Sequence, residues 1–145
     1  VNEILSDLNL KNGEDFNISK ISGGQRQRVA FARAIIAEKD ILFADEPTGN
    51  LDWYNAEKLM EMLNYKLGKD KTSIIVTHDI EIALKFATKI VNIDKRFDSE
   101  FKSYYGVIDS NSIYIKDQEN WLHSSKTKDL KLVRSELKSK FLPKI

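Results

Sequence analysis

The sequence contains no cysteine and has almost no net charge, and each absence excludes a class of protein. With no Cys among its 145 residues, the chain can form neither disulfide bonds nor metal sites built on thiolates, which is compatible with a reducing cytosol. Its 23 Lys and Arg residues nearly balance 22 Asp and Glu residues, so no chain-wide field favours a nucleic-acid partner. We therefore expect no nucleic acid among its partners.

Long hydrophobic runs are also missing from the sequence. Apolar stretches such as residues 41–44 and 74–76 are far too short to cross a bilayer, so any membrane role is expected to be peripheral. The N-terminus shows no secretory signal, and its apolar spacing predicts an amphipathic helix with one face formed by Val1, Ile4, Leu5 and Leu8. Because the chain begins with Val, we expect it to be a piece of a longer protein.

What the sequence does contain is an alternation of strand and helix patterns. After a loop at residues 9–19, helices are predicted over residues 25–37, 53–67 and 80–87, and apolar strands over residues 41–44, 73–77 and 89–93. The second helix is expected to be capped by Asp52, to end at Gly68 and to bury Ala56, Leu59, Met60, Leu63 and Leu67. The first strand shows no polar alternation, which predicts a strand covered on both faces. This order predicts an α/β fold with a parallel-sheet core.

The pattern changes from about residue 95 onward. Residues 103–109 and 112–117 predict a β-hairpin around Ser110 and Asn111, and residues 126–140 predict a helix. Residues 126–145 hold seven Lys or Arg against two Asp or Glu. Two interpretations stay open for them: a solvated helical tail, or a basic tail that contacts anionic lipid or a partner.

Two adjacent glycines directly precede the helix predicted over residues 25–37, in the segment Ser22-Gly23-Gly24-Gln25. A capping box would explain Ser22 and Gln25. It does not explain the glycines, each of which costs roughly 1 kcal/mol relative to Ala in a helix. A helix N-terminus without side chains also lets a phosphate approach the backbone N–H groups. The sequence therefore leaves a cap and a phosphate-binding site as alternatives.

Polar side chains follow two of the predicted strands at their carboxyl ends. Asp45 and Glu46 follow the first strand, and His78 follows the second. Open α/β sheets bind ligands at this edge. A carboxylate there can hold Mg²⁺, a second can orient or deprotonate a water, and a His can stabilise charge on a γ-phosphate. The set is sufficient for phosphoryl transfer, although each residue alone also fits an ordinary turn or helix start.

These residues resemble the motifs of the ATP-binding cassette (ABC) ATPases. Residues 21–25 resemble the family's signature sequence, with Ile where Leu is usual, and residues 41–46, 50–52 and 74–79 resemble its Walker B strand, D-loop and switch-histidine segment. The string at residues 45–52 is similar to that of lipoprotein-release, macrolide-efflux and cell-division ABC systems. The resemblance covers residues 1–95 and implies a partial P-loop NTPase fold with part of the helical subdomain. Residues 96–145, with the β-hairpin and helix predicted from the pattern, form an extension of unknown role.

The resemblance also implies a role for each motif residue. It implies ATP and Mg²⁺ as cofactors, Glu46 as general base and His78 as a sensor of the γ-phosphate. Asp45 would assist Mg²⁺. Asp52 would communicate across a dimer, and the segment that contacts ATP would be Ser22, Gly23, Gly24 and Gln25. The implied partners are a second ATPase subunit and a transmembrane transporter subunit, at the cytoplasmic, inner face of the cell membrane.

The sequence departs from the family in lacking a Walker A loop, G-x-x-x-x-G-K-[ST]. The nearest string is Gly68-Lys69, but Asp70 follows it and Leu63 stands in place of the first glycine. Because the family completes each ATP site between two subunits, we expect a truncated ATPase that is inactive alone. A parallel core without its N-terminal strands would leave unpaired edges and uncovered apolar surface, so we also expect poor solubility. Two alternatives stay open: a non-catalytic remnant or regulatory fragment, and a DNA-maintenance ATPase of the ABC type.

Overall fold

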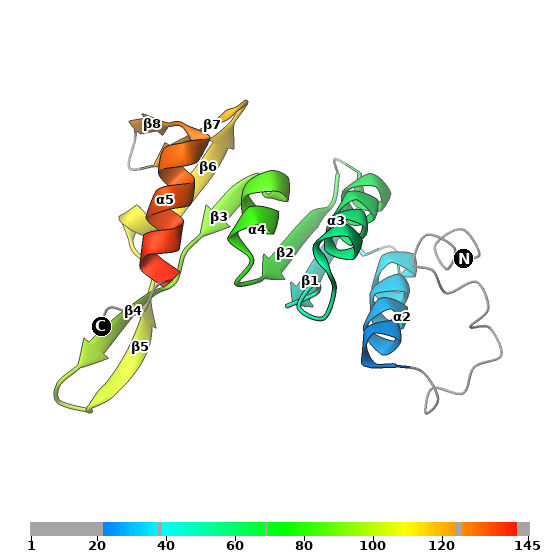
Figure 1. Ribbon diagram of the computed structural model, residues 1–145, viewed down its shortest axis with the longest axis horizontal. Coiled ribbons are helices and arrows are strands. Elements are labelled where there is room, and N and C mark those ends of the chain that lie inside the picture. The colour runs from blue at the N-terminus through cyan, green and yellow to red at the C-terminus, as the bar shows by residue number, and fades with distance from the viewer. Residues whose placement is uncertain (1–21, 38, 69, 124–125, 142–145) are drawn as a thin grey trace. The chain divides into compact units, whose positions relative to one another are not determined.

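The computed structural model describes residues 22–37, 39–68, 70–123 and 126–141 (Figure 1). The chain divides into two compact units, residues 1–78 and 79–145, and each is described by itself. The predicted N-terminal amphipathic helix and the loop at residues 9–19 lie outside the described residues. The division into a motif-bearing part, residues 1–95, and an extension, residues 96–145, stays a prediction.

The first unit contains two parallel strands joined through a helix. Its elements are α2 (Gly23–Ile36), β1 (Ile41–Asp45), α3 (Trp53–Leu67) and β2 (Thr72–Val76). Parallel strands need a crossover connection, which α3 supplies. The strands pair in register from Ile41 opposite Thr72 to Asp45 opposite Val76. Among the described residues of this unit, the four predicted elements are confirmed to within two residues at each end.

Helix α3 is held at both ends as the sequence predicts. The Asp52 side chain accepts a hydrogen bond from the backbone N–H of Asn55, and Gly68 ends the helix with a φ of 65° that disfavours other residues. Four members of the predicted apolar stripe are buried: Ala56, Leu59, Met60 and Leu63. Leu67, at the helix end, is half-buried.

The prediction that β1 is covered on both faces is wrong. Phe43 is 73% exposed and Ile41 53% exposed, whereas Leu42 is buried. The register places Ile74 beside Phe43 and Val76 beside Asp45, so these side chains share one face of the two-stranded sheet. In the described part of the chain no layer packs on this face, and the continuous apolar pattern therefore does not translate into burial.

The second unit is built on an antiparallel sheet and two helices. Four strands lie in the order β3-β6-β7-β8 and two more form the hairpin β4-β5. The elements are α4 (Ile80–Phe86), β3 (Lys89–Val91), β4 (Asp94–Asp98), β5 (Ser103–Val107), η2 (Ser110–Ser112), β6 (Ile113–Asp117), β7 (Asn120–His123), β8 (Lys126–Lys128) and α5 (Leu130–Phe141).

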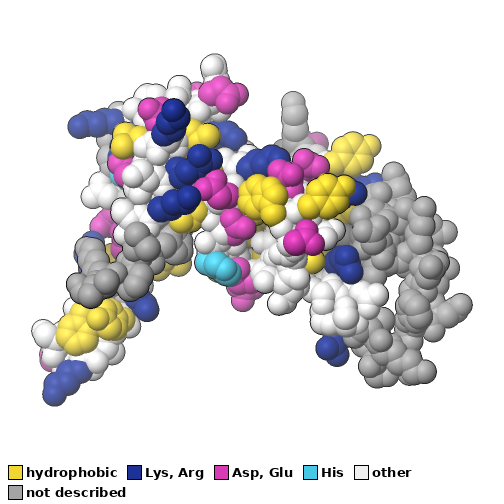
Figure 2. All heavy atoms as spheres, in the orientation of Figure 1, with side chains coloured by type: hydrophobic (Ala, Val, Ile, Leu, Met, Phe, Trp, Pro, Cys, Tyr) yellow, Lys and Arg dark blue, Asp and Glu magenta, His cyan; other side chains and the backbone are white. Residues whose placement is uncertain are grey.

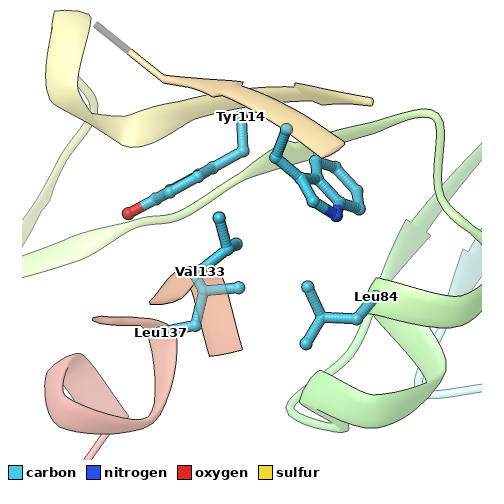
Figure 3. Close-up of a cluster of buried hydrophobic side chains, with 5 residues drawn as sticks. Leu84, Tyr114, Val133 and Leu137 are labelled. Carbon is cyan, nitrogen blue, oxygen red and sulfur yellow. The ribbon is translucent and has the colours of Figure 1, made fainter. Parts of the chain in front are cut away.

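One hydrophobic cluster fastens both helices to this sheet. Leu84 from α4 and Val133 and Leu137 from α5 converge on two aromatic residues of the sheet (Figure 3). These are Tyr114 on β6 and Trp121 on β7, which have no exposed surface. Large aromatic rings bury much apolar area, so this cluster anchors α5 to the sheet.

Three predictions for the second unit are wrong in part. The third predicted strand pairs antiparallel with β6 rather than joining β1 and β2. No hairpin turns at Ser110 and Asn111, because β5 pairs with β4 and β6 pairs with β3 and β7. Asp109 instead caps the short 3-10 helix at that point. The C-terminal helix begins at Leu130, after a strand over Lys126–Lys128.

The basic residues of the C-terminal helix lie close to carboxylates of the same unit. Arg134 and Lys138 lie 2.9 and 3.0 Å from the carboxylate of Glu81 on α4. Lys140 lies 3.3 Å from Asp94. The helix also buries an apolar stripe, so it is an integral layer of this unit rather than a solvated tail.

Candidate functional site

Helix α2 begins with the predicted capping box. The Ser22 hydroxyl accepts a hydrogen bond of 3.2 Å from the backbone N–H of Gln25, and the Gln25 side chain accepts one of 2.8 Å from the backbone N–H of Ser22. This reciprocal pair satisfies two donors of the first turn. The structure thus accounts for Ser22 and Gln25 through local folding.

The two glycines of this first turn are not explained by the fold. Neither Gly23 nor Gly24 has a positive φ, and a Cβ built on either would meet nothing within 4 Å. Alanine would therefore fit both positions and favour the helix by roughly 1 kcal/mol each. The described structure therefore gives no packing or backbone reason for glycine at either position.

Glu46 and His78 meet at the carboxyl ends of β1 and β2. The Glu46 Oε1 atom lies 2.8 Å from His78 Nδ1 and also accepts a hydrogen bond of 3.1 Å from the His78 backbone N–H. The parallel register brings them together, because the Glu46 N–H donates to the carbonyl of Val76 at 2.9 Å. The sequence prediction that these side chains share one sheet edge is confirmed.

Glu46 also has two unusual features. Its φ is 44°, a left-handed conformation that is uncommon for a residue other than glycine. Its second carboxylate oxygen, Oε2, is buried and has no hydrogen-bond partner within the described structure. A buried carboxylate oxygen needs a donor such as a water or a ligand. Strained conformations held at a strand end are typical of functional sites.

Gln27 connects helix α2 to the turn that carries Glu46. Its Nε2 atom donates to the carbonyls of Glu46 and Pro47, each at 3.0 Å, and its Oε1 atom accepts from Asn50 at 3.2 Å. One side chain thus ties the glycine-bearing helix to the residues after β1. The sequence does not reveal this role, because nothing in the local pattern distinguishes Gln27 from a solvated helix residue.

Comparison with known proteins agrees with these motifs. The family model described as "ABC transporter" matches residues 1–49. The probable ABC transporter ATP-binding protein p29 of Mycoplasma pneumoniae is 41% identical over 95 residues, 65% of this chain and 39% of that protein. The lipoprotein-releasing system ATP-binding protein LolD of Pseudoalteromonas translucida is 43% identical over 93 residues, 63% of this chain and 40% of that protein.

A solved structure extends the similarity to the fold. It is the dimeric, post-hydrolysis structure of the ATP-binding cassette MJ0796 bound to ADP and Pi, with 38% identity and a TM-score of 0.55 over 61% of this chain and 39% of that chain. The chain is related to the ATP-binding proteins of ABC transporters. It spans about two fifths of the length of the relatives named above, at 39% and 40%.

The ABC motif residues Asp45 and Asp52 lie in different settings. Asp45 ends β1 on the sheet's exposed face, beside Val76. Asp52 caps α3, and hydrogen bonds from the Asn55 backbone N–H and side chain hold the pKa of Asp52 below its usual value. Asp45 therefore remains available to a ligand, whereas the carboxylate of Asp52 is used by the helix cap.

The ABC motifs do not by themselves enclose a metal ion in the described part of the chain. No group of three or more His, Cys, Asp or Glu side chains there could hold one. Magnesium commonly binds through one or two carboxylates plus water and substrate phosphates. Asp45 fits that mode as a single carboxylate ligand.

No helix among the described residues is long and apolar enough to span a bilayer.

Proposed function

We propose that this chain acts in the ATP-binding subunit of an ABC transporter and contributes residues to the hydrolysis of ATP. Glu46 serves as general base, His78 interacts with the γ-phosphate, and Asp45 assists Mg²⁺. Ser22, Gly23, Gly24 and Gln25 contact ATP held by a second subunit, and Asp52 communicates across that dimer. ATP with its Mg²⁺ supplies the phosphoryl group to be transferred.

The observation that carries this proposal is the pair formed by Glu46 and His78. Oε1 of Glu46 is taken by the backbone N–H and ring of His78, while Oε2 is buried without a partner in the described structure. A carboxylate held through one oxygen can use the other to accept a proton from a water. The contact with Glu46 also fixes the ring of His78 at the edge where a phosphate would lie.

The start of α2 supports the second part of the proposal. The capping box leaves other N–H groups of the first turn without a partner inside the helix, at its positive end. No side chain shields them at Gly23 and Gly24. A triphosphate held by another subunit would find unobstructed donors there.

The proposed partners follow from the same relatives. The similar MJ0796 cassette is dimeric with ADP and Pi, and LolD is the ATP-binding protein of a lipoprotein-releasing system. We place this chain in a comparable complex, with a second ATPase subunit and a transmembrane subunit, on the cytoplasmic side of the cell membrane. The transported substrate would be chosen by the transmembrane subunit.

ATP-dependent pairing tests the proposal. The chain is mixed with a full-length LolD protein whose general base is replaced by Gln, and association is followed by sedimentation velocity with ATP, with ADP and without nucleotide. We expect a mixed dimer with ATP only. Gly24→Asp should abolish it, because a carboxylate would repel the triphosphate. Lys58→Asp, on the surface of α3, is the control. It makes the chain more negative by two charges, one more than Gly24→Asp does, but away from the start of α2.

Two results would contradict the proposal. One is a mixed dimer that forms equally without nucleotide or with the Gly24→Asp variant. The other is ATP hydrolysis by the chain alone at a rate that Glu46→Gln does not change. Each variant is first checked by circular dichroism, so that loss of folding is not mistaken for loss of nucleotide contact.

A further inference from the structure

The hairpin β4-β5 and its turn expose several large aromatic side chains to solvent. Phe97 is 55% exposed, Phe101 74% and Tyr104 66%. The rings of Phe97 and Tyr104 contact each other across the strands, with centroids 5.1 Å apart. Hydrophobic side chains gather on the hairpin in Figure 2. Exposed apolar patches of this kind mark interaction surfaces.

The register separates the hairpin into two faces. Phe97 opposite Tyr104 and Lys95 opposite Gly106 lie on one face, which we call the aromatic face. The other face carries Asp94, Arg96 and Asp98 from β4 and Tyr105 from β5. Acidic residues of β4 are therefore confined to the face opposite the aromatic pair.

Gly106 extends the aromatic face by one more residue. A Cβ built on Gly106 would lie 2.8 Å from Cγ2 of Ile93, which is too close for any side chain. Ile93, 65% exposed, therefore lies over Gly106 on this same face. The absence of a side chain at Gly106 lets Ile93 join Phe97 and Tyr104 in one apolar strip.

Two lysines lie near the aromatic strip, Lys95 on the aromatic face and Lys102 in the adjoining turn. The Nζ atom of Lys95 lies 5.5 Å from the centroid of the Tyr104 ring. Neither Lys95 nor Lys102 pairs with a carboxylate among the described residues. By contrast, Asp98 accepts hydrogen bonds from the N–H groups of Glu100 and Phe101 in the turn.

Asp94 and Asp109 each form an ion pair, whereas Glu100 in the turn forms none among the described residues. Asp109 pairs with Arg96 at 2.8 Å, and Asp94 pairs with Lys140 at 3.3 Å. Glu100, in the turn, is the acidic residue nearest in sequence to Phe101 and Lys102. The aromatic face thus combines an apolar strip with Lys95, and Lys102 lies beside Glu100 and Phe101 in the turn that joins the strands.

We propose that the aromatic face of β4-β5 binds the surface of an anionic lipid bilayer. Phe and Tyr rings insert at the boundary between headgroups and acyl chains, and Lys95 and Lys102 bind anionic headgroups. A two-stranded hairpin is only marginally stable in water, and a bilayer that covers its apolar face would also stabilise it. This proposal does not depend on nucleotide chemistry and can fail or hold independently of it.

Flotation of the full chain with lipid vesicles tests the proposal. One vesicle preparation contains phosphatidylcholine with about one part in four of phosphatidylserine, and the other contains phosphatidylcholine alone. Tyr104→Ser and Phe101→Ser should each lower binding to the anionic vesicles about fivefold or more. Tyr105→Ser, one residue along on the opposite face, is the matched control and should change it less than about twofold.

Charge variants test the electrostatic part. Replacing Lys95 and Lys102 together by Gln should lower binding to the anionic vesicles about tenfold or more and leave binding to phosphatidylcholine unchanged. Glu100→Gln should raise binding to the anionic vesicles. Emission from the buried Trp121 confirms that each variant is folded.

Two outcomes would overturn the proposal. Equal losses in the Tyr104→Ser and Tyr105→Ser variants would show that the aromatic face is not the binding surface. A folded chain that stays out of the lipid fraction at every vesicle concentration would assign the face to a protein partner instead.

Discussion

At the scale of single residues, Gln27 bonds the start of α2 to the turn after β1. Gln27→Leu would remove the donor shared by the Glu46 and Pro47 carbonyls and the acceptor used by Asn50. We expect the free energy of unfolding of the first unit to fall by roughly 1 to 3 kcal/mol. Urea denaturation followed by circular dichroism measures it. Asn50→Ala, which removes one of the three bonds, should cost less, and equal costs would contradict this account.

Tyr114 provides a residue-scale prediction about pH. Burial, with the negative charges of Glu136 and Asp94, raises the pKa of Tyr114 to about 12, whereas an unfolded Tyr ionises near pH 10. The pKa of Tyr114 is higher in the folded than in the unfolded chain. Its contribution to the free energy of unfolding is therefore fully present below about pH 10 and is lost as pH rises toward about 12.

Urea denaturation at several pH values in this window checks that prediction. In a Trp53→Phe background, Trp121 emission reports on the second unit alone. The free energy of unfolding should fall less steeply with pH in Tyr114→Phe than in the parent, and Tyr105→Phe, at an exposed position, should keep the parent slope. Parallel slopes for Tyr114→Phe and the parent would contradict the effect of burial.

Residue-scale features differ in how far sequence predicts them. The capping box at Ser22 and the cap at Asp52 are confirmed, because each depends on residues three positions apart. The Glu46 and His78 contact is confirmed because both follow strands that pair in parallel. The bonds of Gln27 and the φ of Glu46 could not be predicted, since they depend on how distant segments pack. The chemical roles of these residues stay predictions.

At the scale of elements, α5 is the layer that holds the second unit together. Leu137 is buried at 2% exposure, whereas Leu132 on the same helix is 47% exposed. Leu137→Ala should lower the free energy of unfolding of this unit by about 2 to 5 kcal/mol through the cavity it leaves. Leu132→Ala should change it by less than about 0.5 kcal/mol. Denaturation in the same Trp53→Phe background, followed by Trp121 emission, compares them, and similar losses would show that α5 does not pack as described.

Sequence predicts elements better than it predicts how they pair. The helices and strands from α2 to α4 are confirmed, since each has local start and stop signals such as Asp52 and Gly68. The predicted strand pairing of the second unit was wrong. Residues 103–107 have two possible antiparallel neighbours, and the turn after Asp98 decides between them. Asp98 caps that turn, which pairs β5 with β4.

At the scale of the whole molecule, the exposed face of β1-β2 predicts self-association. Phe43 is 73% exposed, and Ile41, Ile74 and Val76 lie on the same face. Apolar faces and strand edges left open in this way favour contact with a second molecule. Sedimentation velocity at rising concentration should show association that Phe43→Ser reduces. Tyr65→Ser, at 79% exposure on α3, is the control, and an equal reduction by both variants would contradict a role for the sheet face.

The same exposure agrees with the chain's relation to longer proteins. The relatives named above are matched over about two fifths of their length, at 39% and 40%. The sequence predicts the motifs that α2, β1 and β2 carry, but its apolar pattern did not predict that one face of β1-β2 is exposed. The proposed ATPase role thus concerns residues that act together with a second subunit.

The most direct test of the proposed ATPase role is whether the backbone of Gly23 and Gly24 meets a triphosphate. The chain contains six glycines, so selective ¹⁵N-glycine labelling gives few amide resonances. These are recorded by NMR after mixing with the LolD variant described above, with ATP or with ADP. Our account predicts that ATP shifts the Gly23 and Gly24 signals and leaves Gly106, in the hairpin, unchanged. A mixed complex in which the two signals stay at their free positions would contradict it.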